Sequence, residues 1–429
     1  MSADALTWLL SFSDPARGVG WNTASRGGLE WNLRRTRVLL DFAGSPDRAL
    51  KVVLVAGTKG KGSTAALLAS VLSASGVKAG LSTKPHLQSF RERIRVDGMA
   101  ISDPALAQGI DALRPLVLTL SRLLPEAGAP TTFELTTVLA LAHYAAESCA
   151  VAVLEVGLGG KFDATNATDP HISVITPISH DHTKELGSGI GRIAAEKAGI
   201  IRPGRRALIA PQPAVAQAVI VAACTRTGTP WTSVRPMTPA AAQRAGLVLV
   251  GAHQRANAAV ALAAAHALAE HGVPVRAHNT GLAALRWPGR FEIIAGSPTI
   301  VLDGAHNDGS ASALAAALRA KFPRRKIRFV LGLMADKDAR AVVTPLIQLA
   351  AAVEATRPRG PRALAPASLA RIIRGVPVRT HDDVAAAIAA ARRGATARDV
   401  VCVTGSLALV GEARDVLGLP VAERLWDRA

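Results

Sequence analysis

Short runs of β-branched residues alternate with alanine- and leucine-rich segments through the first half of the chain. The runs at 51–56, 151–156 and 172–177 are predicted as buried strands, and the segments at 63–75 and 137–147 as helices. Strands that alternate with helices form parallel sheets with helices on their faces. The chain is therefore predicted to be an α/β protein.

A second series of the same kind follows a polar stretch at 273–289 that is marked by proline and glycine. We interpret this stretch, which comes after a predicted helix at 257–270, as a joint between domains. A chain of 429 residues also exceeds what one hydrophobic core usually supports. We predict two domains, 1–286 and 287–429, with a cleft between them. The elements expected in the second are strands at 293–303, 327–333, 352–356 and 400–404 and helices at 310–321 and 383–392.

The net charge of +18 raises the question of nucleic-acid binding. Basic pairs such as Arg34-Arg35 and Arg392-Arg393 are scattered along the chain, without interleaved aromatic residues or a nucleic-acid motif. This pattern favours a general positive field that attracts anionic substrates. No nucleic-acid partner is predicted.

The opening segment shows no targeting pattern, because Asp4, Asp14 and Arg17 interrupt it. The alanine-rich run at 258–269 is broken by His266 and is shorter than the roughly 20 residues of a membrane span. We expect a cytoplasmic protein without a membrane partner. The three cysteines lack the paired spacings of zinc ligands and are expected to be buried thiols.

A glycine-rich segment joins the first predicted strand to the first predicted helix. Backbone N–H groups and the helix dipole stabilise phosphate oxygens at such a turn, and Lys61 would neutralise the terminal phosphates. The strict nucleotide-loop spacing is not met, since Gly62 stands between Lys61 and the hydroxyl residues. The alternative is a turn that only caps a helix. The predicted ATP-binding residues here are Gly57, Thr58, Lys59, Gly60, Lys61, Gly62, Ser63 and Thr64.

The segment 55–64 resembles the phosphate loop of folylpolyglutamate synthase and bifunctional dihydrofolate synthase, members of the Mur ligase superfamily. The resemblance implies a P-loop central domain with a parallel-rich sheet, a smaller Rossmann-like C-terminal domain, and a protein that is commonly monomeric. Further segments agree in order and spacing: 85–87, 92–94, 154–160, 163–166, 181–182, 196–200, 253–257, 287–292, 303–307 and 404–407.

The reaction implied by the resemblance joins a carboxylate to glutamate after ATP has phosphorylated that carboxylate. Such chemistry needs metal ligands, a phosphate loop and cationic side chains in one cleft. Glu155 ends an apolar strand at the sheet edge that carries the phosphate loop, and His182 follows the next strand. The family assigns Mg²⁺ to both positions. Without the family, Glu155 could be a paired core carboxylate and His182 a hydrogen-bonded loop histidine.

Lys197 matches a lysine that is often carbamylated in this family. Carbamylation would turn a cation into an anionic group close to the metal. Taken alone, the residue reads as a helix lysine paired with Glu196 or exposed to solvent.

Residues after the first strand of the second domain are expected to reach the nucleotide across the cleft. The family assigns nucleotide contacts to the positions of Asn257, Arg290 and Asp303, and places His306 and Ser406 near the glutamate site. By sequence alone, Asn257 would be a helix-surface amide and Ser406 a helix N-cap.

Two segments match family regions that contact dihydropteroate. An aromatic face with a carboxylate nearby suits stacking on an aminopterin ring and hydrogen bonding to it. Phe133 could equally be a core residue at a helix start. The predicted substrate-binding residues are Thr131, Thr132, Phe133, Glu134, Phe162, Asp163 and Ala164.

The sequence departs from the family at two positions. Lys59 replaces the usual asparagine of the phosphate loop, and Lys84 stands where the family normally has a serine that ligates magnesium. A protonated lysine has no lone pair for a metal. We hypothesise that the Lys84 ammonium partly replaces one metal ion and leaves a single Mg²⁺. The rival interpretation is a paralogue that uses another acyl substrate.

The sequence thus predicts an acid–amino-acid ligase of folate metabolism. Its substrates would be ATP, L-glutamate and either dihydropteroate, folates or both, with Mg²⁺ as cofactor. Alternatives are a ligase restricted to one of these steps, a related ligase for another acid, and a nucleotide-binding protein without catalysis.

Overall fold

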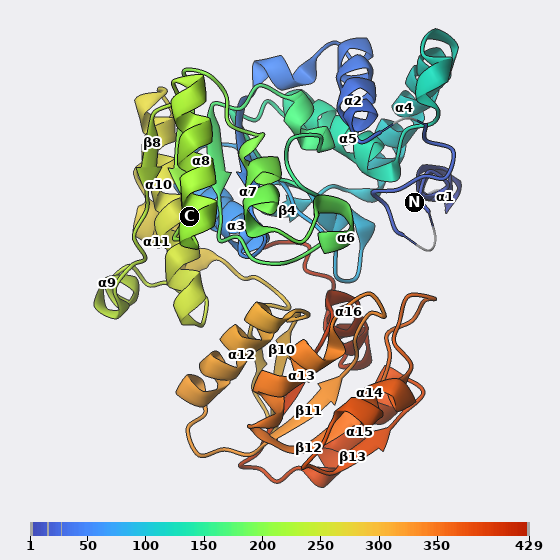
Figure 1. The fold of residues 1–429 in the computed structure, drawn as a ribbon, viewed down its shortest axis with the longest axis vertical. Helices are drawn as coiled ribbons and strands as arrows, with labels where there is room; N and C mark the ends of the chain where they lie inside the picture. Colours follow the sequence, from blue (N-terminus) through green and yellow to red (C-terminus); the bar gives the residue numbers. More distant parts are fainter. Residues whose placement is uncertain (1–2, 15–16, 27, 427–429) are drawn as a thin grey trace.

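The computed structural model describes residues 3–14, 17–26 and 28–426. The chain forms two α/β units, one above the other in Figure 1, and each surrounds its own sheet. We call the elements α1–α11 and β1–β8 the first unit, and β9–β14 with α12–α16 the second unit. The predicted α/β class with two parallel-rich sheets is confirmed.

The first sheet is parallel from β2 to β8, and β3 and β4 add an antiparallel edge. Every residue of its central strand β5 is buried, as a strand covered on both faces requires. Within the described residues its eight strands lie in the order β4 (Met99–Ala100), β3 (Ile94–Val96), β2 (Ala79–Ser82), β5 (Val151–Glu155), β1 (Lys51–Ala56), β6 (Ile172–Ile175), β7 (Arg206–Ile209) and β8 (Trp231–Ser233).

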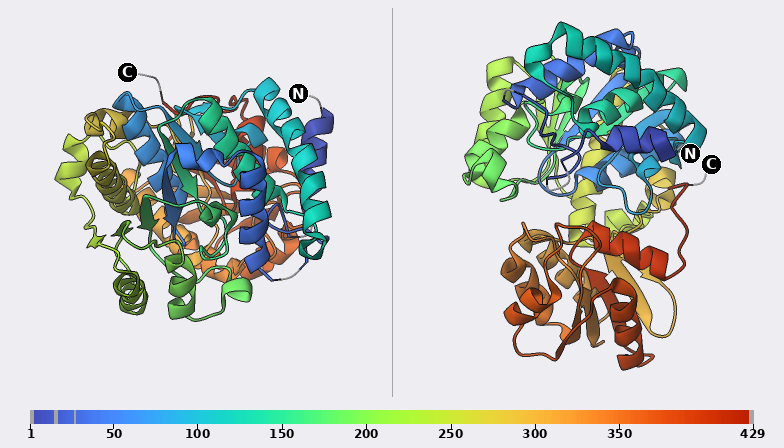
Figure 2. Two further views of the ribbon diagram at one scale, coloured as in Figure 1. Left: turned by 90° about the horizontal axis from the view of Figure 1, so that it is seen from above. Right: turned by 90° about the vertical axis from the view of Figure 1, so that its right-hand side faces the viewer.

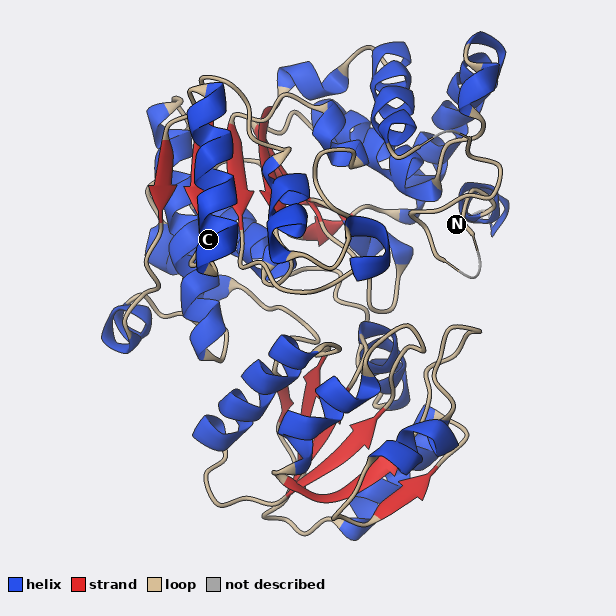
Figure 3. Cartoon of the chain, viewed as in Figure 1, coloured by secondary structure: helices blue, strands red, loops and turns tan. Residues whose placement is uncertain are grey.

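Helices cover both faces of this sheet, as Figure 3 shows. One face packs against α1 (Ala3–Leu10), α2 (Glu30–Phe42), α4 (Asp103–Leu123), α5 (Thr132–Ala146), α7 (Ile190–Ala198) and α8 (Ala214–Thr227). The other packs against α3 (Lys61–Ala74), α10 (Ala252–Glu270) and α11 (His278–Ala284). The short helices are α6 (Thr183–Leu186) and α9 (Pro239–Arg244).

The second sheet is parallel except for the edge strand β9. In the part of the chain that the structure describes, its order is β13 (Val378–Thr380), β12 (Ala350–Ala355), β11 (Ile327–Leu331), β14 (Val400–Thr404), β10 (Thr299–Asp303) and β9 (Glu292–Ile294). Its helices are α12 (Asp308–Lys321), α13 (Ala339–Ile347), α14 (Pro366–Ile372), α15 (Val384–Gly394) and α16 (Leu407–Val416). No helix in the described ranges combines the length and apolar character that a membrane crossing needs.

The strand predicted at 293–303 is wrong, because this segment forms two antiparallel strands, β9 and β10. Gly296 and Pro298 lie between them, and proline has no N–H for a strand ladder. The helix predicted from 137 begins five residues earlier, at Thr132. The reason is the capping box of Thr131 and Glu134, whose side chain and backbone bond each other reciprocally.

The chain passes between the units twice. The stretch 273–289, interpreted as a joint, contains α11, which packs against α3, so the first passage begins after α11. After α16 the chain returns to the first unit, as Figure 2 shows, and Leu425 and Trp426 join the core beneath α3 and α10. The predicted division at residue 286 does not describe this return, and it stays a prediction.

Candidate active site

The glycine-rich segment predicted as a phosphate loop lies between β1 and α3, the strand and helix expected on either side of it. Gly57 has φ 138°, and a Cβ there would lie 1.9 Å from the Thr176 hydroxyl oxygen, so only glycine fits. The backbone N–H groups of Thr58 and Lys59 both donate to the Pro177 carbonyl. The Lys61 ammonium lies over the loop and donates to the Gly57 and Thr58 carbonyls at 3.1 and 3.3 Å. These contacts fix the loop in a bend that presents Lys61 at the start of α3.

Glu155 ends β5 beside this loop. Glu155 is paired in register with Val55 of the neighbouring strand β1, so its carboxylate and the loop after β1 lie at the same edge of the sheet. Oε2 accepts the backbone N–H of Lys84 at 3.0 Å, and it lies 3.2 Å from where a Cβ on Gly62 would stand. The carboxylate therefore rests against the first turn of α3.

His182 precedes α6 with φ 51° and has a half-exposed side chain. Burial lowers the pKa of its imidazole, and the neighbouring Asp181 opposes that shift. Among the described residues, no group of three or more His, Cys, Asp or Glu side chains converges as a closed metal site. Mg²⁺ in nucleotide sites is commonly held by one or two carboxylates, substrate phosphates and water. The single carboxylate of Glu155 beside the loop fits a Mg²⁺ ion that takes its other ligands from phosphate and water. The described residues do not form a site that would hold the ion by protein ligands alone.

The second unit contributes a turn directly after β10. Both oxygens of Asp303 are engaged, one by the Phe291 N–H at 2.8 Å and the other by the Ala305 N–H at 2.9 Å. Burial raises the pKa of Asp303, and the Arg290 guanidinium opposes that shift. His306 Nδ1 lies 2.8 Å from the Gly304 carbonyl oxygen. Burial also lowers the pKa of His306.

A cavity between the two units brings these groups together. Lys61 and Glu155 line it from the first unit, and Asp303 lines it from the second. Asn257, expected on a helix surface from the sequence alone, is buried in this wall and donates to the Gln254 side-chain oxygen. The other predicted residues that line it are Thr58, Lys59, Gly60, Gly62, Ser63, His182, Arg290 and His306.

Several predicted site residues lie outside the lining of this cavity. Gly57 and Thr64 are buried behind it within the loop and the first turn of α3. Ser406 is buried and its hydroxyl oxygen accepts the Leu409 N–H, so it is the N-cap of α16, as the sequence alone indicated. The hydroxyl of Thr132 bonds the Leu9 carbonyl in the core.

Lys197 is also outside the lining and is buried in α7. A solvent-exposed lysine, one of the plain interpretations, is therefore wrong. Burial and repulsion from Lys61 lower its pKa to about 7, while Asp181, Asp163 and Glu196 attract the ammonium. At neutral pH a large share of this amine is uncharged.

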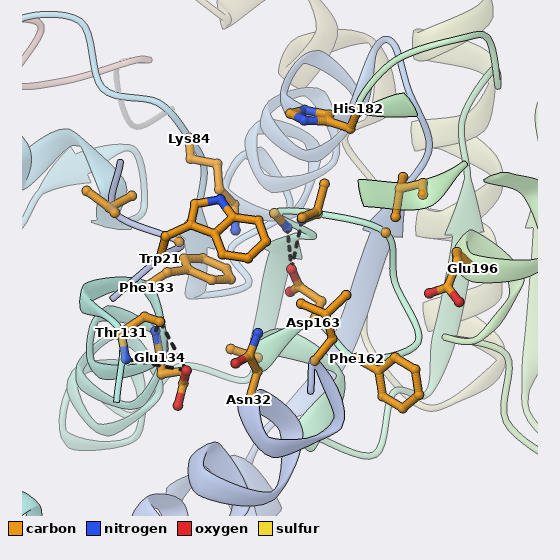
Figure 4. A pocket seen from close by; sticks show the side chains of 18 residues that line it. Trp21, Asn32, Lys84, Thr131, Phe133, Glu134, Phe162, Asp163, His182 and Glu196 are labelled. Atoms are coloured by element: carbon orange, nitrogen blue, oxygen red, sulfur yellow. Dashed lines mark hydrogen bonds between the residues drawn. The ribbon is translucent and has the colours of Figure 1, made fainter. Parts of the chain in front are cut away.

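A second pocket adjoins the first and is shown in Figure 4. Its walls carry the predicted Thr131, Phe133, Glu134, Phe162, Asp163 and Ala164. Trp21 and Asn32 also line it, and sequence analysis missed both. The matched motifs begin after Trp21, and only the aromatic character of Trp21 in a polar stretch could have indicated it.

The two carboxylates predicted for pterin recognition are already bonded within the protein. Glu134 forms a buried bidentate ion pair with Arg35, with both N–O distances 2.8 Å. Asp163 accepts the N–H groups of Gly157, Leu158 and Thr165. Both carboxylates therefore hold the pocket walls in place, and any bond to a ligand must be added to these.

The units touch around the cavity through opposite charges. The Lys337 ammonium lies 3.5 Å from Asp181 across the gap. The Lys59 ammonium lies against the first turn of α12, since a Cβ on Gly309 would be 1.7 Å from it. Burial lowers the pKa of Lys59, and attraction to Asp308 opposes that shift. Lys59 from the first unit and the N-terminus of α12 from the second therefore both place positive charge at the cavity. This arrangement favours a bound anion.

Comparison with known proteins gives consistent matches over both units. The description "Mur ligase middle domain" matches residues 55–218, and "Mur ligase, glutamate ligase domain" matches residues 289–407. The chain is 32% identical to the dihydrofolate synthase/folylpolyglutamate synthase of Bacillus subtilis, over 90% of the chain and 95% of that protein. It is 35% identical to a "Probable bifunctional folylpolyglutamate synthase/dihydropteroate synthase" of Haloferax volcanii over 88% of the chain, and spans about half of that longer relative, 47%.

Solved structures agree with the sequence matches. The folylpolyglutamate synthase of Mycobacterium tuberculosis complexed with ADP superposes with a TM-score of 0.84 at 33% identity, covering 93% of the chain and 96% of that structure. FolC of E. coli in complex with DHPP and ADP gives a TM-score of 0.81 at 30% identity, covering 96% and 97%.

Proposed function

Because the chain belongs to the dihydrofolate synthase/folylpolyglutamate synthase family of Mur ligases, we propose that it uses ATP to join L-glutamate to dihydropteroate and to folates. The observation that carries the proposal is the cavity between the units, which Lys61, Glu155 and Asp303 line together. A pocket with Trp21, Phe133 and Phe162 in its walls adjoins it. The FolC structure was solved with both DHPP and ADP, which supports the same pairing of sites here.

The geometry suggests how the residues of the chain divide the work. The phosphate loop and Lys61 would hold the triphosphate, with Asn257 packed against the loop and Arg290 reaching in from the second unit. A substrate carboxylate oxygen would attack the γ-phosphorus, and the bond from that phosphorus to the β-phosphate oxygen would break to release ADP. The glutamate nitrogen would then attack the acyl carbon and displace phosphate.

Mg²⁺ is proposed as the cofactor, held by Glu155 and His182, which both line the cavity. When bound, it would offset the negative charge of the β- and γ-phosphates. His306 is proposed at the glutamate side of the cavity. The low pKa of the buried imidazole suits it to hydrogen bonding as a neutral ring.

We further propose that Lys197 is carbamylated. Its buried amine, with a pKa of about 7, is neutral often enough to react with CO₂, and the ammonium of Lys61 would stabilise the resulting anion. We also propose that the protein is a cytoplasmic monomer that does not bind nucleic acid. One chain supplies both walls of the cavity, which supports a monomer, and the basic pairs are scattered along the sequence, which argues against a nucleic-acid partner.

ADP release should be measured with dihydropteroate, with tetrahydrofolate and with no acceptor, each in the presence of glutamate and Mg²⁺. Release with both acceptors supports the bifunctional reading, and release with one supports a monofunctional synthase. Release with neither acceptor contradicts a folate substrate. The omission of glutamate is the control, because net ADP release by a ligase requires it.

A further inference from the structure

One ammonium group lies where the two cavities meet. Lys84 lines both the nucleotide cavity and the aromatic pocket. In Figure 4 its side chain lies beside Phe133 and Asp163, and its Nζ is 3.4 Å from the centroid of the Phe133 ring. Gly157 and His182 also line both cavities, so these three residues mark the boundary between them.

The Lys84 ammonium is buried, and within the described part of the chain Nζ makes no hydrogen bond. Asp163 and Glu155 attract it, but neither carboxylate bonds to Nζ. Glu155 Oε2 accepts the backbone N–H of Lys84, and Asp163 accepts the backbone N–H of Gly157. A buried ammonium without an acceptor is costly, so an anionic ligand at this point would be strongly favoured.

We propose that Lys84 binds the substrate carboxylate that is to be phosphorylated and holds it between the two cavities. The inference rests on the proposed function and names a residue that determines which acids the ligase accepts. The Phe133 ring and the other pocket walls would take the flat ring system. Nζ would donate to one carboxylate oxygen while the other oxygen attacks the γ-phosphorus.

Lys84 forms no covalent bond in this step and keeps its protons. The new bond joins carboxylate oxygen to phosphorus, the bond that breaks releases ADP, and the ammonium offsets the repulsion between the two anions. ATP phosphates are the competing ligand for the same charge. In the proposed function Lys61 and the loop hold the phosphates, whereas Lys84 is the one lysine that lines the aromatic pocket among the described residues.

The test compares Lys84→Met with wild type by titration calorimetry in the presence of ADP. Methionine keeps the length of the stem over Phe133 and removes the charge. The ligands are dihydropteroate and its carboxamide, which differ at the reacting group alone. Lys161→Met is the matched control. Lys161 Nζ lies 4.8 Å from the ring centroid of Phe162, another aromatic residue of the pocket, but Lys161 is exposed and lines neither cavity.

We expect wild type and Lys161→Met to prefer the carboxylate by about 10- to 100-fold, the range of a charge-assisted hydrogen bond. Lys84→Met should bind both ligands within about twofold of each other, with the ADP affinity unchanged. An undiminished preference in Lys84→Met overturns the inference, as does equal affinity in wild type, which needs no variant. A selective loss of ADP affinity in Lys84→Met would assign Lys84 to the phosphates instead. If wild type binds neither ligand, the folate substrate itself is wrong and the inference falls with it.

Discussion

At the scale of single residues, burial is the largest cause that lowers the pKa of both Lys84 and Lys197. At Lys84, Asp163 and Glu155 oppose that shift, and Arg93 and Lys61 repel the ammonium by less. At Lys197, repulsion from Lys61 adds to the effect of burial. A cluster of repelling cations is stabilised by a polyanion, so nucleotide binding should also stabilise the fold around it.

Carbamylation of Lys197 predicts a pH dependence with a definite sign. With a pKa of about 7 the amine is half neutral at that pH, whereas an ordinary lysine is neutral in about one molecule in 3,000. Only the neutral amine reacts with CO₂, so the carbamate should be lost as the pH falls through 7. We expect bicarbonate to raise activity in CO₂-depleted buffer at pH 7.5, and a carbamate carbon signal with ¹³C-bicarbonate.

Lys197→Met supplies the control for that experiment. Methionine cannot be carbamylated, so neither the signal nor the bicarbonate response should survive the substitution. A bicarbonate response of equal size in this variant would place the effect elsewhere in the protein.

Glu155→Gln tests the metal role of the carboxylate at the loop. The amide keeps the shape, but it loses the charge that would hold Mg²⁺. We expect kcat to fall by about 100-fold or more and the Mg²⁺ concentration for half-maximal rate to rise. ADP affinity measured in EDTA should stay within about twofold of wild type, because the loop is unaltered. Unchanged Mg²⁺ dependence would remove Glu155 from the metal site.

Sequence predicted the residues whose chemistry is local and missed those placed by tertiary contacts. The loop could be predicted because glycine, lysine and the flanking strand and helix are contiguous. The position of Trp21 and Asn32 in the pocket could not be predicted, since only the folded N-terminal segment brings them there. The bonds that occupy Glu134 involve Arg35, 99 residues away, and no short-range pattern reveals them.

At the scale of elements, central strands were predicted more accurately than edge strands. The strand at 400–404 has the predicted bounds, because a strand buried on both faces is a continuous apolar run. The predicted strand at 293–303 failed at the sheet edge, where β9 turns back on β10. Its apolar residues on either side of Gly296 gave no sign of the reversal.

The turns before and after α3 contain glycines whose substitution should have unequal effects. Gly57→Ala combines an unfavourable φ of 138° with a collision against Thr176, whereas Gly76→Ala at φ 77° meets open space. Gly76→Ala should cost about 1 kcal/mol of unfolding free energy, and Gly57→Ala clearly more, with weakened ADP binding. Urea denaturation and ADP titration measure both. Equal costs for the two variants would contradict the tight packing of the loop.

At the scale of the whole molecule, the C-terminal return stabilises the first unit. Trp426 is buried in its core, and Trp231 is 41% exposed on the edge strand β8. Trp426→Ala should lower the unfolding free energy by about 3–5 kcal/mol, and Trp231→Ala by less than about 1 kcal/mol. Chemical denaturation of both variants tests this. A small effect of Trp426→Ala would mean that the tail adds little to the core.

The double crossing of the chain has a consequence for how the protein comes apart. A protease that cuts the passage after α11 produces two polypeptides, yet the tail of the second stays anchored in the first through Leu425, Trp426 and the backbone bond from Leu425 to Gly98. The nicked protein should therefore migrate as one particle under native conditions and separate only in denaturant. The same double tether limits the units to rocking about a line through both crossings, so opening the cleft for product release need not let them drift apart.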